Sequence, residues 1–133
     1  MSVFRGIDVT FGGLTSFTIS TTSNSDVIDL HALKYFDIDS LGMWERWGIY
    51  SGTGTVTFKV QHSPNSSDWY DLGTTGAPIS ASSSSEYVAP LPSSKVTPER
   101  YVRVAATVAG GTPSLASVQI SLRAQILKNE RRI

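Results

Sequence analysis

A strict alternation of apolar and polar residues along positions 55–61 constrains the fold of this chain most. Val56, Phe58 and Val60 occupy every second position, so an extended strand places all three on one face. The residues between them are polar, which predicts a strand that is half buried in an antiparallel sheet. A polar stretch at 62–68 and then Trp69 follow, and this order is typical of a β-hairpin.

The same alternation returns twice near the C-terminus, in residues 100–108 and 117–126. In both stretches the even positions are apolar and most of the odd positions are polar. We therefore predict that the even positions of the three strands face a common core. The predicted core residues are Val56, Phe58, Val60, Val102, Val104, Val118, Ile120 and Leu122.

Serine and threonine make up about a quarter of the 133 residues, a composition that favours strands and turns over helices. Seven or eight short strands separated by turn residues predict an all-β fold, an antiparallel β-sandwich that is jelly-roll-like and forms a single domain over residues 1–133. Residues 73–97 are rich in Ser, Pro and Gly and predict one long surface loop, with brief pairing at Ile79 and at 87–88.

The remaining segments carry weaker signals. Residues 1–6 suggest an N-terminal arm before the first strand, and residues 128–133 a charged C-terminal tail. Glycines at 51–54 and 110–114 predict hairpin turns. Residues 31–39 fit a helical turn followed by a strand.

Charge and composition exclude several classes of function. The formal net charge is zero and the pI is about 6.7, so no basic field attracts nucleic acid or a membrane surface. The chain has no cysteine and therefore no disulfide or thiolate metal site. It has no 18-residue apolar run and no signal peptide, which predicts synthesis in the cytoplasm.

Groups able to catalyse are sparse. His31 and His62 are the only imidazoles, and the Ser-His-Asp and Gly-x-Ser-x-Gly patterns are not present. Asp37 and Asp39 would share a strand face, but a calcium site needs more oxygen ligands in a compact loop. We therefore predict no catalytic, cofactor-binding or metal residues, no cofactor and no enzymatic activity.

Aromatic residues are the better candidates for binding. Trp44, Trp47, Trp69, Tyr70 and Tyr87 fit packing in a core or an interface, and exposed members could also stack on sugar rings. Those near the expected loops, together with the apolar and basic residues of the expected arm, are the candidate partner-binding residues. They are Val3, Phe4, Arg5, Trp44, Trp47 and Tyr87.

The turn at 63–69 resembles the Asp-box hairpin of sialidases, in which a polar side chain braces the loop and an aromatic residue packs beneath it. This chain lacks the usual glycine of that motif. The resemblance implies a structural turn and no catalysis.

Four segments in a fixed order resemble small β-rich structural proteins encoded in the head genes of tailed bacteriophages. They are residues 55–63, which end in Gln-His-Ser, 68–73 with the aromatic pair Trp69-Tyr70, 99–104 with Arg-Tyr-Val-Arg, and 107–114. The resemblance covers roughly residues 52–127. The chain departs from it by having Ser66-Ser67 in place of a glycine-containing turn, and by its Ser-rich loop.

This resemblance implies a capsid decoration or cement protein, located in the virion on the outer capsid surface. Its partner would be the major capsid protein, and it would act as a homo-oligomer, often a trimer, that bridges neighbouring capsomers. Alternatives are a tail or neck component, a carbohydrate-binding module on a virion surface and, as a distant third, a hydrolase with an unrecognised site.

Overall fold

The computed structural model describes residues 2–9, 11, 17–32, 38–82, 84–88 and 97–127. These residues form strands and turns with no helix, so no helix among them could cross a membrane. The strands are β1 (Ser2–Val9), β2 (Phe17–Ile19), β3 (Ser23–Asn24), β4 (Ile28–Asp29), β5 (Ile38–Trp47), β6 (Tyr50–Gly52), β7 (Thr55–Ser63), β8 (Tyr70–Thr75), β9 (Ser84–Val88), β10 (Tyr101–Ala109) and β11 (Pro113–Leu127).

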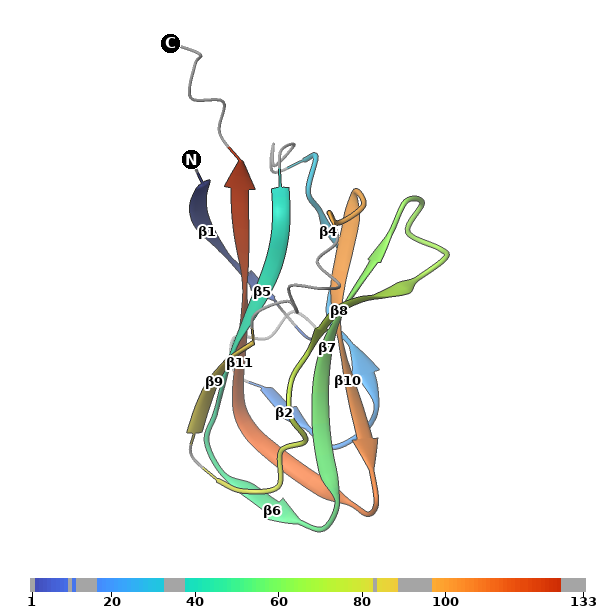
Figure 1. Cartoon of the computed structure of the whole chain (residues 1–133). Coiled ribbons are helices and arrows are strands. Elements are labelled where there is room, and N and C mark those ends of the chain that lie inside the picture. The colour runs from blue at the N-terminus through green and yellow to red at the C-terminus, as the bar shows by residue number, and fades with distance from the viewer. Residues whose placement is uncertain are drawn as a thin grey trace.

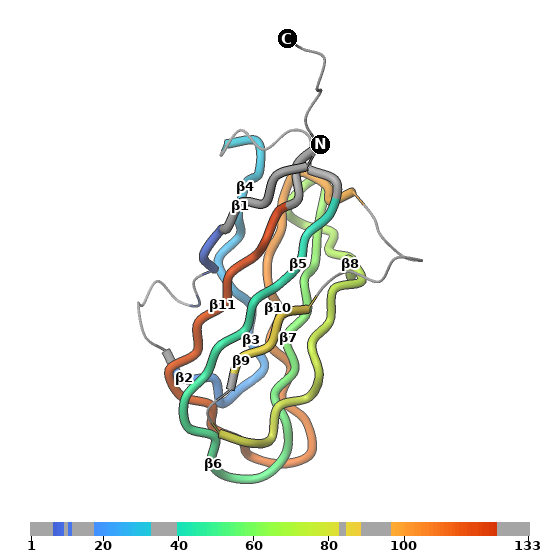
Figure 2. Tube along the Cα trace, turned by 60° about the vertical axis from the view of Figure 1, so that its left-hand side comes forward, coloured from blue at the N-terminus to red at the C-terminus, as the bar shows by residue number. Residues whose placement is uncertain are grey.

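Two antiparallel sheets pack face to face, which confirms the predicted β-sandwich (Figure 1). The first sheet has the order β1-β11-β5-β9, with β2 and β6 also pairing with β11. The second has the order β3-β10-β7-β8, with β4 also pairing with β10. In Figure 2, β11, β5 and β9 run side by side in one layer while β10 and β7 lie in the layer behind. The jelly-roll order stays a prediction.

Strand β11 is the centre of the first sheet. Its first part pairs with β6 and β2, and its second part pairs with β1 and β5. The register shifts between Leu115 and Val118, and Ser117 there has a φ of 57°. This irregularity changes which residues face inward, from Pro113 and Leu115 before it to even positions after it. The strand bends at this end of the sandwich, as Figure 1 shows.

The core lies between the two sheets and contains every core residue predicted from the alternation. Val56, Phe58 and Val60 are fully buried, and the five predicted residues of β10 and β11 are no more than 2% exposed. The rings of Phe11 and Phe58 meet edge to face with centroids 6.2 Å apart. The period-two pattern therefore identified the buried faces of three strands correctly.

The glycine turns are not hairpins, in contrast to the prediction. The turn at 53–54 leads from β6 in the first sheet to β7 in the second, and the turn at 110–112 leads from β10 back to β11. The two corners contact each other, because Thr112 N–H donates to Thr53 Oγ1 at 3.3 Å. Gly54 needs its φ of 89°, and a Cβ there would clash with the Ala109 carbonyl.

Two other expectations differ from the structure in part. Residues 2–6, expected to be an arm, form the first part of β1 and pair with the end of β11, with Ser2 opposite Leu127. Within the expected long loop, Ile79 bridges Val56 and β9 pairs with β5, as the brief pairing predicted. The expected tail at 128–133 and most of the expected helical turn at 31–39 lie outside the described residues.

The hairpin of β7 and β8 matches the prediction from its turn residues. Asn65 Oδ1 accepts from the backbone N–H groups of Ser67 and Asp68, both at 2.9 Å, and Asn65 Nδ2 donates to Asp68 Oδ2 at 2.8 Å. Ser66 has a φ of 63°, a conformation that glycine adopts more easily. Side-chain bonds from Asn65 therefore hold a turn from which the usual glycine is missing.

Candidate functional site

The outer face of the first sheet carries the most plausible binding surface. On β5, Leu41 and Met43 face the core, so Trp44 and Arg46 point outward. Trp44 lies opposite Tyr87 of β9. Arg123, on the adjacent strand β11, also faces outward. We call Trp44, Arg46, Tyr87 and Arg123 the aromatic–arginine face.

Trp44 and Tyr87 form a tilted pair across the two strands. Their ring centroids are 5.9 Å apart, with an angle of 36° between the planes, and Tyr87 is 41% exposed. The Tyr87 ring extends over Gly42, where a Cβ atom would clash with the tyrosine hydroxyl. The glycine therefore leaves the space in which Tyr87 lies across β5.

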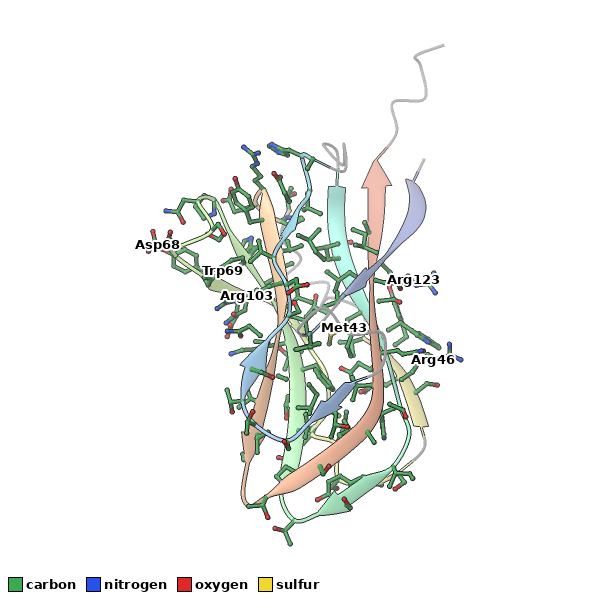
Figure 3. All side chains as sticks on the ribbon, turned by 180° about the vertical axis from the view of Figure 1, so that it is seen from behind. Met43, Arg46, Asp68, Trp69, Arg103 and Arg123 are labelled. Atoms are coloured by element: carbon green, nitrogen blue, oxygen red, sulfur yellow. The ribbon has the colours of Figure 1, made fainter. Side chains whose placement is uncertain are left out.

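The two arginines flank this aromatic pair along the strand direction. Arg123 lies opposite Gly42, two positions before Trp44 on β5, and Arg46 lies two positions after Trp44. Both are exposed, and neither forms an ion pair with any residue that the structure describes. Figure 3 shows both side chains directed away from the sandwich, whereas Met43 lies between the sheets. Their guanidinium groups are therefore available to carboxylates of a partner.

The acid nearest in register to this face is already engaged. Asp8 of β1 accepts a hydrogen bond of 2.6 Å from the Ser121 hydroxyl. Ser121 lies between Asp8 and Trp44 in the register of the three strands. Among the described residues, Asp8 forms no ion pair with Arg46 or Arg123.

The structure brings together two of the six residues proposed from the sequence, Trp44 and Tyr87. Trp47 is half buried and packs against the core, with its indole N–H donating to the Ala81 carbonyl at 2.8 Å. The backbone of residues 3–5 belongs to β1, and their side chains lie outside the described part of the chain. Arg46 and Arg123 were missed, although both occupy polar positions of alternating strands.

A second feature lies under the opposite side of β9. A pocket of about 410 Å³ is lined by Trp47, residues 77–81, Ser85 and Glu86. On β5, opposite Glu86 of β9, Glu45 is fully buried, and neither of its carboxylate oxygens has a hydrogen-bond partner among the described residues. Burial, together with the charge of Glu86, raises the pKa of Glu45 to about 8. The inward positions Leu41, Met43 and Glu45 share one parity, a signal that sequence reasoning overlooked.

His62 and Asp29 form hydrogen bonds that connect neighbouring parts of the fold. The Nδ1 atom of His62 accepts from the Glu99 backbone N–H at 3.1 Å, and burial lowers the pKa of His62. Arg100 donates to both carboxylate oxygens of Asp29, at 2.9 and 2.8 Å, and these bonds lower the pKa of Asp29 to about 2. No group of three or more His, Cys, Asp or Glu within the described ranges could hold a metal ion.

The comparisons with known proteins give no family assignment. No protein-family model matches the chain, and a search of curated proteins found no significant match. The chemistry of the aromatic–arginine face therefore has to be judged by itself. Aromatic residues and arginine are enriched at the centres of protein interfaces, where rings supply buried area and guanidinium groups bind carboxylates.

Proposed function

We propose that this chain is a structural protein of a tailed-bacteriophage virion, a decoration or cement protein that binds the outer capsid surface and reinforces the shell. Its partner is the major capsid protein, and it acts as a homo-oligomer, most simply a trimer. The chain is made in the host cytoplasm and resides on the capsid. The proposal combines the sequence resemblance with the chemistry of one sheet face.

The observation that carries the proposal is the aromatic–arginine face. A ring pair with an exposed tyrosine, flanked by two arginines that have no carboxylate partner among the described residues, is a surface suited to another protein. Isolated exposed aromatics are ordinary on monomers, but this pair is positioned by a glycine and bordered by two like charges. An acidic, partly apolar patch on the capsid protein would complement it.

Multivalent contacts with a repeated lattice can raise the binding affinity above that of a single face. A closed shell presents the same patch many times, and a trimer engages three patches at once. Because the second and third contacts form within an already bound complex, each copy needs only modest affinity. Under these conditions a small binding face is sufficient.

Binding to purified shells tests the proposal directly. Tyr87→Ala removes the exposed ring of the pair, and Tyr70→Ala removes a ring that is 59% exposed on the second sheet. We expect the occupancy of shells by Tyr87→Ala to require at least about tenfold more protein, equal to about 1.4 kcal/mol, and Tyr70→Ala to bind like the unmodified chain. Equal binding by both variants would contradict the claim that the aromatic–arginine face binds the shell.

The number of copies of this chain per virion distinguishes a capsid protein from a neck or tail component. Imaging of virions for extra density, with mass-spectrometric counting of this chain, is expected to give hundreds of copies on the capsid. A handful of copies would favour the alternative of a neck or tail component. A chain that never co-purifies with virions would overturn the virion assignment.

A carbohydrate-binding module is the second candidate, because the Trp44–Tyr87 pair also offers faces on which sugar rings stack. Glycan arrays with the isolated chain test this alternative. Binding that is lost in Tyr87→Ala and kept in Tyr70→Ala would favour the sugar over the capsid protein as ligand.

A further inference from the structure

Glu45 is the least expected residue in the interior of the sandwich. It follows Leu41 and Met43 in the inward series of β5, and it is 0% exposed. No donor among the described residues reaches either carboxylate oxygen. An ionised carboxylate in such a place has lost its hydration without replacement, which is strongly unfavourable.

Strand β9 places a second carboxyl group beside it. Glu86 lies directly opposite Glu45 in the antiparallel register. Two ionised carboxylates can only accept hydrogen bonds, so a bond between them requires a proton on one of the two. Burial, and then the charge of Glu86, raise the pKa of Glu45 to about 8.

The other groups around Glu45 do not offer a counter-charge. The backbone of Gly76 lies against the carboxylate so closely that a Cβ there would overlap Glu45 Oε2. Ile120 is the partner on β11, and residues 77–81 contain no titratable side chain. Arg46 follows on β5 but faces outward. Glu86 is thus the one charged group, among the described residues, that perturbs Glu45.

We propose that Glu45 and Glu86 share one proton at neutral pH, and that this acid pair fastens the edge strand β9 to β5. Loss of the proton at mildly alkaline pH then places two negative charges side by side, one of them fully buried, and releases β9. This strand lies at the end of the sheet order and is held by β5 alone among the described strands. It is therefore the strand that can leave without opening the centre of the core.

Release of β9 has a consequence on the opposite face of the sheet. Tyr87 follows Glu86 in β9 and points outward toward Trp44. When β9 separates from β5, the aromatic pair separates with it. The acid pair is therefore a pH-sensitive latch for the aromatic–arginine face.

The direction of the pH dependence follows from the two states of the chain. The unfolded chain loses the Glu45 proton near the ordinary value of 4.5, whereas the folded chain keeps it up to about pH 8. Proton binding thus favours the folded state throughout this window. The stabilising contribution is complete below pH 4.5 and is lost as the pH rises through 8.

Titration of the side-chain carboxyl ¹³C signals of the full chain tests the shared proton. We expect one glutamate midpoint to lie near 8. Glu45→Gln should remove the high midpoint, and Glu99→Gln, at an exposed position, should leave it unchanged. The absence of any glutamate midpoint near 8 in the unmodified chain would overturn the proposal.

Glu86→Gln provides a second variant if Glu45→Gln does not fold. It should lower the high midpoint by removing the neighbouring charge, while burial keeps that midpoint above 4.5. An unchanged midpoint in Glu86→Gln would overturn the proposal that Glu45 and Glu86 share one proton.

Amide hydrogen exchange in residues 84–88 tests the latch. After correction for the intrinsic rates, we expect protection in β9 to fall about tenfold between pH 7 and 9, with β10 unaffected. Glu45→Gln should keep its β9 protection over this range, and Glu99→Gln should behave like the unmodified chain. Constant protection of β9 in the unmodified chain would overturn the latch. These measurements use the isolated chain, so they stand apart from the outcome of shell binding.

Discussion

The two outer faces of the sandwich differ in how their charges are used. On the second sheet, Arg103 stacks on Trp69 at 4.2 Å and donates to Gln61 at 2.9 Å. Gln61 and Lys59 in turn donate to Asp71, and these bonds lower the pKa of Asp71. Every charge of this series has a partner within the face, and Figure 3 shows Trp69 and Arg103 together on that side.

The first sheet presents an aromatic residue and arginines of the same kind, but they are not joined. Arg46 and Arg123 have no ion-pair partner in the described part of the chain, and Trp44 contacts Tyr87 instead of a cation. Side chains that interact within their own face contribute to the stability of the fold. Side chains without such partners can form those interactions with another protein. The contrast predicts that substitutions on the two faces affect different measurements.

The largest effect is expected in the core that supports both faces. Phe58 is fully buried and lies between the sheets, so Phe58→Ala should lower the free energy of unfolding by about 3–5 kcal/mol. Urea denaturation measures this loss. A change below 1 kcal/mol would contradict the burial on which the whole comparison depends.

On the outer face of the second sheet, Arg103→Ala should lower the free energy of unfolding by about 1–2 kcal/mol, because it removes a cation–π contact with Trp69 and a hydrogen bond to Gln61. Binding to shells should be unchanged. Loss of binding without loss of stability would show that the roles of the two faces are exchanged.

Gly42→Ala sharpens the comparison at the aromatic pair. The added methyl group would displace the Tyr87 hydroxyl, but that end of the side chain can move into solvent. We expect a stability change of no more than about 1 kcal/mol, altered near-ultraviolet circular dichroism and weaker binding to shells. Unaltered spectra would mean that Tyr87 does not lie across β5.

The smallest stability effect is expected for Arg46→Ala and Arg123→Ala, each within about 0.5 kcal/mol of the unmodified chain, because both side chains are exposed and neither has an ion-pair partner within the described ranges. Shell binding should nevertheless weaken, and more so in the double variant. A destabilisation of 2 kcal/mol would place these arginines in a structural network instead.

The sequence predicted the parts of this fold that depend on local periodicity. The even positions of β7, β10 and β11 face the core because one period-two pattern runs through each strand. The prediction that the turns at 53–54 and 110–112 close hairpins was wrong, because both connect strands of different sheets. A glycine turn permits the chain to reverse but does not specify whether the next strand stays in the same sheet. That choice depends on distant strands.

The candidate site was predictable only in part for related reasons. Trp44 and Tyr87 were proposed as aromatics, but their pairing requires β9, which begins in a serine run with no apolar alternation. Glu45 was missed because its shared parity with Leu41 and Met43 was overlooked, and a charged residue is not expected at a buried position. The arginines gained significance only when the structure showed that both lie on the outer face without an ion-pair partner in the part of the chain that it describes.

The central position of β11 also has a consequence for the order of folding. Its partners in the first sheet come from early and middle parts of the chain, and the contact of Ser2 with Leu127 joins almost its two ends. During synthesis β1 and β5 therefore leave the ribosome long before the strand that separates them exists. The first sheet can close only after translation of residue 127, so folding should be slow for a domain of this size and should expose unpaired strand edges that invite aggregation.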